Sequence, residues 1–211
     1  MPHKIRMKTI FAFSDIHEGT LPPRLLAVAE ESDYVFFLGD GAARMGDLAL
    51  HKGFFAVKGN CDYLPLPEET VTEVEGVKIL LTHGHRYGVK TDLLSLALRA
   101  EELGCRLVFF GHTHTAEIVE HGAVTLVNPG SLTHPSFGTP TYAYTVITEG
   151  RAFTKLVPAP GHLSPPLREI MLKVRVTMRL APQSSHYANP TAAYRSLPVQ
   201  WRLLANIVQN R

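Results

Sequence analysis

The stretch Lys8-Thr9-Ile10-Phe11-Ala12-Phe13-Ser14-Asp15-Ile16-His17 is a short apolar run that ends at once in an acid and a histidine. Its apolar part is only six residues long and contains Ile and Phe, so it predicts a buried β-strand rather than a helix. The polar residues that follow it would then lie at the carboxyl end of that strand.

The same pattern occurs four more times along the chain. Each time a run of four to six residues, rich in Val, Ile, Leu and Phe, stops close to Asp, Asn or His. These runs and endings are Tyr34–Leu38 with Gly39-Asp40, Phe54–Val57 with Gly59-Asn60-Cys61-Asp62, Val77–Leu81 with Thr82-His83-Gly84-His85, and Arg106–Phe110 with Gly111-His112-Thr113-His114.

Helical patterns separate some of these predicted strands. Pro22–Glu31 begins with a proline, as helix N-termini allow, and Thr91–Leu103 begins at Thr91 or Asp92 and stops at Gly104. Strands that alternate with helices predict an α/β fold with a mostly central sheet.

Turn signals between further apolar runs predict β-hairpins, which would build a second and more antiparallel sheet packed on the first. The predicted turns are Glu75-Gly76, His121-Gly122 and Glu149-Gly150.

Length and composition fit one ordinary domain with an appendage. A chain of 211 residues can bury enough surface to fold without disulfide bonds. Its two cysteines, Cys61 and Cys105, show no paired spacing, and its apolar runs are short. We therefore expect a cytoplasmic protein that is not inserted in a membrane.

Charge divides the chain near Pro158. Up to this residue there are 14 Lys and Arg against 18 Asp and Glu, and beyond it 7 against 1. Prolines also interrupt the pattern after Pro158. We expect a domain over residues 1–158 and a basic, proline-containing extension over 159–211, in which 169–180 is a candidate strand and 199–208 a candidate helix.

The residues at the five strand ends carry the chemistry. Ligands of open α/β sheets bind beyond the carboxyl ends of the strands, where the loops converge. A single Asp or His there is more often a turn residue, but five strand ends with the same feature indicate one shared site. Imidazoles and carboxylates without a set of thiolates favour Mn, Fe or Zn over Mg or Ca. With a neutral oxygen from Asn60, such a site is net positive and attracts phosphate.

In order and spacing, the five motifs resemble those of the calcineurin-like metallophosphoesterases. Asn60-Cys61-Asp62 and a later Asn128-Pro129-Gly130-Ser131 are similar to the small bacterial and archaeal phosphodiesterase branch, to which the retromer subunit of this fold is more distantly related. The resemblance covers residues 8–157. It implies two packed β-sheets flanked by helices, a four-layer α/β/β/α sandwich.

The resemblance also implies two divalent metal ions per chain, with Mn as the first expectation and Fe, Zn, Ni or Co as alternatives. Asp40 would bridge the two ions. Such a pair, about 3.5 to 4 Å apart, can share a hydroxide, clamp the phosphate and offset charge on the attacking and leaving oxygens of an in-line displacement. The implied ligands are Asp15, His17, Asp40 and His114 for one ion, and Asp40, Asn60, His83 and His112 for the other.

Asn60, Cys61, Asp62 and His85 are candidates for catalytic roles. His85 would contact either the substrate or a metal ligand, and Asp62 would orient His17 or Asn60 or cap the next turn. Cys61 stands where many larger relatives carry a histidine. A thiol near two cations is a weak general acid, and the alternative is that Cys61 only packs beside the site.

Two features depart from the resemblance. Small relatives place Lys or Arg a few residues after Asn-Pro-Gly-Ser, whereas this chain reads Leu132-Thr133-His134-Pro135-Ser136, so the loop lacks a cation for phosphate. We expect His134 to point away from the site. The other departure is the basic extension over 159–211, which the small relatives lack.

Three functions stay open at this point. The leading one is a phosphodiesterase for small or activated diesters. Its oligomeric state is left open, and a homo-oligomer is one possibility. The second is a non-catalytic, retromer-like scaffold, which would not need the complete ligand set. The third is a nuclease-type enzyme that uses the basic extension to hold nucleic acid, although no aromatic interleaving or nucleic-acid module accompanies the charges.

Overall fold

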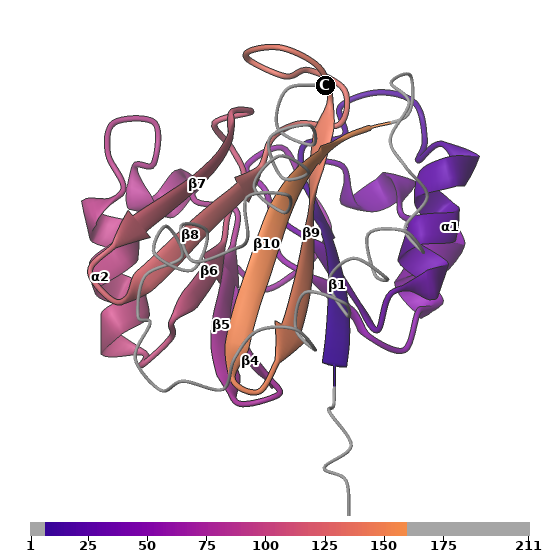
Figure 1. Cartoon of the computed structure of the whole chain (residues 1–211). Coiled ribbons are helices and arrows are strands. Elements are labelled where there is room, and N and C mark those ends of the chain that lie inside the picture. The colour runs from indigo at the N-terminus through magenta and orange to yellow at the C-terminus, as the bar shows by residue number, and fades with distance from the viewer. Residues whose placement is uncertain (1–6, 160–211) are drawn as a thin grey trace, which may run out of the picture. The chain divides into compact units, whose positions relative to one another are not determined.

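The computed structural model of the protein describes residues 7–159, which form two sheets with a helix on the outer side of each (Figure 1). The strands are β1 (Met7–Phe13), β2 (Tyr34–Phe37), β3 (Phe54–Ala56), β4 (Glu69–Val74), β5 (Val77–Thr82), β6 (Leu107–Phe109), β7 (Ala116–His121), β8 (Val124–Pro129), β9 (Thr141–Thr148) and β10 (Arg151–Pro158). The helices are α1 (Pro23–Glu31) and α2 (Leu94–Glu102), with 3-10 turns η1 (Ala42–Arg44), η2 (Gly46–Leu50) and η3 (His85–Tyr87).

The two five-stranded sheets have the strand orders β10-β9-β1-β2-β3 and β4-β5-β6-β8-β7 within the described residues. Side chains alternate between the two faces of each strand. Ile10 and Ala12 of β1 therefore join the core between the sheets, while the rings of Phe11 and Phe13 stack on the opposite face with centroids 5.0 Å apart. Burial of both faces explains why the strands are continuously apolar. The predicted architecture of two packed sheets flanked by helices is confirmed.

Parallel pairing brings the polar strand endings to one edge. In the first sheet β1 is parallel to β2 and β2 to β3, and in the second sheet β5 is parallel to β6 and β6 to β8. The carboxyl ends of neighbouring parallel strands lie together, so the loops after them converge, as the sequence predicted.

The expectation of a second, more antiparallel sheet is wrong. Each sheet combines two parallel and two antiparallel pairings among the described strands. The last hairpin, β9–β10, joins the first sheet because β9 pairs with β1, Met7 lying opposite Thr148. Strand β9 is buried along almost its whole length, so it needs a neighbour on each side.

Two element boundaries differ from the sequence prediction. Helix α2 begins at Leu94 rather than Thr91, because Gly88 adopts a left-handed φ of 64° and residues 88–91 form a turn. Asp92 lies before the helix, and its Oδ1 accepts the Leu94 N–H over 2.9 Å. In the β7–β8 hairpin the pairing continues to His121 opposite Val124, so residues 122–123 form the turn.

Apart from Ala159, the predicted extension lies outside the described residues, and so do its candidate strand and candidate helix. Between residues 7 and 159, neither helix is long and apolar enough to cross a membrane.

Candidate metal centre

The loops that follow β1 and β2 are joined through their main chains. The Asp15 N–H donates to the Gly39 carbonyl over 3.0 Å, and the Ile16 N–H donates to the Asp40 carbonyl over 2.7 Å. These bonds continue the pairing of the two parallel strands past their ends. The side chains of Asp15 and Asp40 are thereby held next to each other, both buried.

Four of the predicted ligands have a backbone conformation that L-residues rarely adopt. The φ angles of Asp15, Asp40, His112 and His114 are 58°, 60°, 69° and 58°. Such a conformation costs on the order of 1 to 3 kcal/mol per residue and persists only where the surrounding structure enforces it. Its concentration on predicted ligands supports a functional role for this edge of the sheets.

Glycines precede several of these residues because the loops pass very close to one another. A Cβ on Gly59 would lie 2.0 Å from Asp40 Oδ1, and a Cβ on Gly111 would lie 2.0 Å from Ser14 Oγ. No side chain fits at either place. The Gly-Asn and Gly-His sequences thus reflect the packing of the ligand loops against each other.

Within residues 7–159, three groups of side chains offer ligand atoms that all lie within 4.8 Å of one another. They share members, so they form one continuous cluster in which Asp15, His17 and Asp40 each belong to two groups. The groups are Asp15, His17 and His114; His17, Asp40 and Cys61; and Asp15, Asp40 and His83.

On one side of the cluster, His114 has a fixed ring orientation. Its Nδ1 lies 2.7 Å from the carbonyl of His134, so Nδ1 carries the proton and Nε2 is left with a lone pair. This Nε2 lies 3.1 Å from Asp15 Oδ1 and 3.2 Å from His17 Nε2. Asp15 Oδ1 is buried and makes no hydrogen bond to any described residue. Lone pairs of three ligands therefore converge.

On the other side, His83 repeats this arrangement. Its Nδ1 lies 2.7 Å from the Leu38 carbonyl, which leaves Nε2 without a proton in the neutral ring. That Nε2 lies 3.1 Å from Asn60 Oδ1 and 3.5 Å from Asp40 Oδ2. Again a nitrogen lone pair meets oxygen atoms, an arrangement that is unfavourable without a positive charge between them.

These contacts are those expected of residues that hold cations. The close contact with the Asp15 carboxylate raises the pKa of His114, and although burial lowers the pKa of His83, the nearby carboxylates of Asp40 and Asp15 raise it overall. Burial raises the pKa of Asp40, but the contact with His83 and the hydrogen bond from the Cys61 N–H lower it well below its usual range. The cluster thus attracts positive charge, and its mixture of imidazole and carboxylate suits a divalent transition metal.

His112 lies at the border of this cluster. Its ring centroid is 5.1 Å from that of His83, and its backbone N–H donates to Asp15 Oδ2 over 3.2 Å. Burial and the nearby His83 lower the pKa of His112 to about 4, so its ring is neutral and able to act as a ligand near neutral pH. His112 does not belong to any of the three groups whose atoms converge within 4.8 Å among residues 7–159.

The Asp62 carboxylate makes no hydrogen bond to the side chain of His17 or Asn60, so these bonds do not support the first of its two predicted roles. It caps main chain instead: Oδ2 accepts the N–H groups of Asp40 and Gly59, and Oδ1 accepts those of Gly41 and Ala42, all over 2.8 to 2.9 Å. Asp62 therefore joins the loop that carries Asp40 to the loop that carries Asn60.

Cys61 lies at the site, and it is exposed rather than packed in the interior. Its N–H donates to Asp40 Oδ1 over 2.7 Å, and its Sγ lies 3.3 Å from Asn60 Nδ2. Partial burial and the Asp40 carboxylate raise the pKa of the thiol. Without bound metal, the thiol is therefore neutral near pH 7.

His85 lies beside the predicted ligands His83 and His112, with ring centroids 5.5 and 6.1 Å from theirs. Its Nε2 is 3.6 Å from Glu68 Oε2, and its Nδ1 is buried without a hydrogen bond to a described residue. Burial and the charge of His83 lower the pKa of His85. Glu68 had no signal in the sequence, because it precedes a strand rather than following one.

The loop that begins with Asn128 supports the cluster. Asn128 Nδ2 donates to the Gly111 carbonyl and to Thr113 Oγ1 over 3.0 and 2.9 Å, and Ser131 Oγ donates to the Asp15 carbonyl over 2.7 Å. The sequence marked Asn128 and Ser131 only through the resemblance. Their role here is to fix the loops that carry the predicted ligands.

The expectation that His134 points away from the site is wrong. Its carbonyl anchors His114, and its ring centroid lies 5.6 Å from that of His17. Thr133 Oγ1 accepts the His17 N–H over 3.0 Å, so this loop covers the His17 side of the cluster. Backbone contacts of this kind leave no pattern in a sequence, which explains why Thr133 and His134 were not predicted.

Comparison with known families shows what this chain is similar to. The family described as the calcineurin-like phosphoesterase superfamily domain matches residues 7–150. The probable metallophosphoesterase YsnB of Bacillus subtilis is 36% identical over 119 residues, which are 56% of this chain and 69% of YsnB. The phosphodiesterase YfcE of Escherichia coli K12 is 30% identical over 164 residues, which cover 64% of this chain and 84% of YfcE.

Among solved structures, a predicted phosphoesterase from Streptococcus pneumoniae TIGR4 is similar, with a TM-score of 0.63 and 28% sequence identity. The match covers 76% of this chain and 95% of the streptococcal protein. The family match over residues 7–150 includes every predicted ligand.

Proposed function

The chain belongs to the calcineurin-like phosphoesterase superfamily, and from this premise we propose that it is a phosphodiesterase that uses a pair of divalent metal ions. The observation that carries the proposal is the pair of histidines, His83 and His114, whose free Nε2 atoms face oxygens of Asp40 and Asp15. Activity on diesters is supported by the similarity to YfcE, which is named a phosphodiesterase.

The side chains divide naturally between two ions. Asp15, His17 and His114 would hold one ion, Asn60, His83 and His112 would hold the other, and Asp40 lies within reach of both groups. When bound, a metal pair supplies positive charge for the phosphate and makes a water nucleophilic near neutral pH. Mn is our first candidate for the metal, because it accepts mixed imidazole and carboxylate ligands.

The protein residues contribute orientation. The carbonyls of Leu38 and His134 fix the rings of His83 and His114, and Asp62 and Ser131 fix the loops on which Asp40 and Asp15 lie. A site whose ligands are held in advance loses little entropy when it binds metal and substrate. Such preorganised ligands support the proposal of a metal-dependent enzyme, because the protein residues hold the site in place while water supplies the attacking group.

The scaffold alternative explains the observations less well. A protein that only binds partners gains nothing from four ligands in a strained backbone conformation. The nucleic-acid alternative depends on residues 160–211, which lie outside the described part of the chain. A cytoplasmic location and the absence of a membrane partner stay predictions from the sequence.

A screen of metals against substrates tests the proposal. The purified, metal-stripped chain would be loaded with Mn, Fe, Zn, Ni or Co and assayed with phosphodiesters, phosphomonoesters, cyclic nucleotides and nucleic acids. We expect two ions per chain and highest turnover with small aryl diesters. Failure to hydrolyse any phosphoester after loading would favour the scaffold, and a preference for nucleic acid would favour the nuclease.

A further inference from the structure

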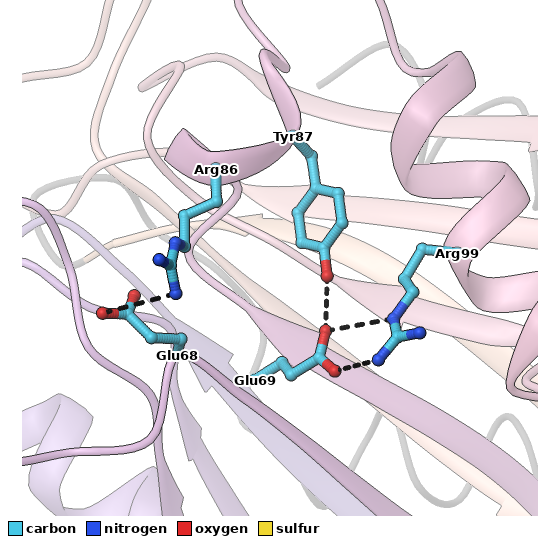
Figure 2. Close-up of a pocket in the computed structure, with 5 residues that line it drawn as sticks. All are labelled: Glu68, Glu69, Arg86, Tyr87 and Arg99. Carbon is cyan, nitrogen blue, oxygen red and sulfur yellow. Dashed lines mark hydrogen bonds and ion pairs between the residues drawn. The ribbon is translucent and has the colours of Figure 1, made fainter.

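A pocket of about 410 Å³ opens beside the metal centre (Figure 2). It is lined by residues from three places in the chain: Glu68 just before β4 and Glu69 at its start, Arg86 and Tyr87 in η3, and Arg99 on α2. Its volume falls within the range of small-molecule sites.

The pocket adjoins the predicted ligands through Glu68. Glu68 Oε2 lies 3.6 Å from His85 Nε2, and the ring centroid of His85 is 5.5 Å from that of His83. Arg86 follows His85 directly in η3. A phosphodiester bound at the metal centre could therefore extend one of its two alcohol groups into the pocket.

One wall of the pocket is internally satisfied. The Glu69 carboxylate accepts hydrogen bonds from Tyr87 and Arg99 (Figure 2). Arg99 Nη1 also donates to Glu102 over 2.8 Å. Because Glu69, Tyr87 and Arg99 already pair with one another, they mainly give this wall a fixed shape. The Tyr87 ring and the Arg99 stem add carbon surface.

The opposite wall has unused hydrogen-bonding capacity. Glu68 Oε2 is buried and lies against His85 Nε2, but Oε1 accepts no hydrogen bond from a described residue, and the Glu68 side chain is partly exposed. Arg86 Nη1 is 3.9 Å from Glu68 Oε1, which is too long for a hydrogen bond, and its side chain is 62% exposed. An acceptor and a donor therefore face the same space.

The charges of the pocket favour an uncharged ligand. Two carboxylates, Glu68 and Glu69, balance two guanidinium groups, Arg86 and Arg99, so a further anion or cation gains little. A hydroxyl group can donate to Glu68 and accept from Arg86 at once. The C–H face of a sugar ring can pack against the aromatic ring of Tyr87 and the arginine stems.

We propose that this pocket binds the uncharged, hydroxyl-bearing alcohol of the substrate, so that diesters of a sugar or a cyclic polyol are the preferred substrate class. The inference rests on the proposed phosphodiesterase function and specifies its substrate. Glu68 and Arg86 act as specificity-determining residues, because they recognise the retained half of the diester rather than the reacting phosphorus.

Two diesters with the same leaving group test the inference on the unaltered, metal-loaded chain. One is the 6-(4-nitrophenyl phosphate) of methyl glucoside, and the other is cyclohexylmethyl 4-nitrophenyl phosphate, which has a ring of the same size without hydroxyls. We expect kcat/KM to be about tenfold higher for the sugar diester, mainly through a lower KM, since hydrogen bonds to charged groups have this strength. Equal kcat/KM values would overturn the substrate class and leave the proposed function standing. Hydrolysis of neither diester would overturn both.

Matched variants test whether the preference for the sugar diester depends on this pocket. Glu68→Gln and Arg86→Ala are expected to reduce the tenfold ratio towards one. Glu73→Gln, at the far end of β4, and Arg151→Ala, at the start of β10, make the same chemical changes on exposed residues outside the pocket and should keep the ratio. Each ratio is measured on one preparation, so it does not depend on the active fraction. A ratio that survives in both pocket variants would overturn the assignment of this pocket.

Discussion

The carboxylate of Asp62 accepts the backbone N–H of Asp40 over 2.9 Å. Asp62 therefore positions Asp40 through the main chain, while the side chain of Asp40 stays directed at the metal centre. Asp62 is itself buried and reaches four N–H groups of two ligand loops. The proposed bridging ligand thus depends on a residue that holds no metal.

Asp62→Asn should weaken metal binding without removing a ligand. The amide nitrogen of the new side chain cannot accept, so two of the four N–H groups lose their partner. We expect the affinity for metal to fall about 10- to 100-fold and the stability to fall by about 2 kcal/mol. Titration with Mn and chemical denaturation would measure both. Asp47→Asn, on an exposed residue of η2, is the control and should change neither quantity.

Asp40→Asn should abolish the metal pair and lower activity more than about a hundredfold, because it removes the carboxylate that lies between the ligand sets proposed for the two ions. His83→Ala should remove one ion and leave the other, since His83 belongs to only one group. Elemental analysis would give the stoichiometry, and circular dichroism would show whether the fold is kept. Two ions retained in an active Asp40 variant would contradict the bridging role.

Cys61 should make turnover depend steeply on the leaving group. Burial and the Asp40 carboxylate raise the pKa of its thiol, whereas two bound cations would lower it and favour the thiolate. In both cases Cys61 is a weak general acid. The departing oxygen must then carry its own charge, and aryl diesters should react much faster than alkyl diesters. A series of leaving groups would be measured for the native chain and for Cys61→His. A shallow dependence that the substitution leaves unchanged would argue against this role.

Glu69 should stabilise the fold at neutral pH and lose this effect in acid. The hydrogen bond from Arg99 lowers the pKa of Glu69, although burial opposes it. A carboxyl with a lowered folded-state pKa contributes stability above its unfolded pKa of about 4.3, and this stability disappears as the pH falls through the folded-state value. Denaturation of the native chain and of Glu69→Gln should therefore differ more at pH 7 than at pH 3. An equal difference at both pH values would exclude this linkage.

Residues 160–211 should be dispensable for the hydrolysis of a small diester, because every proposed ligand precedes them. A chain that ends at Ala159 keeps the last described backbone hydrogen bond, from the Ala159 N–H to the Pro140 carbonyl. We expect its kcat/KM for an aryl diester to stay within about twofold of that of the full chain, since no ligand is lost. A folded but inactive truncated chain would show that the extension completes the site.

The sequence by itself determined the strands and the order of the ligand loops. Runs such as Ile10–Phe13 are short and apolar because they are buried on both faces, and a pattern with that physical cause can be recognised in a single chain. The glycines of Gly59-Asn60 and Gly111-His112 could be read as part of the motifs. Their reason, the 2.0 Å approach of Asp40 Oδ1 and Ser14 Oγ, became visible only in the structure.

Only the tertiary structure decided which sheet each hairpin joins and which polar residues support the site. Strand β9 belongs beside β1, and Asp62 belongs under Asp40, because of contacts between residues more than 20 positions apart in the chain. Such contacts depend on which surfaces meet when the sheets pack. Hydrophobic periodicity indicates whether a residue is buried, but it does not indicate which residue that side chain contacts. For the same reason Glu68 and Thr133 gave no signal in the sequence, although both lie against the predicted site.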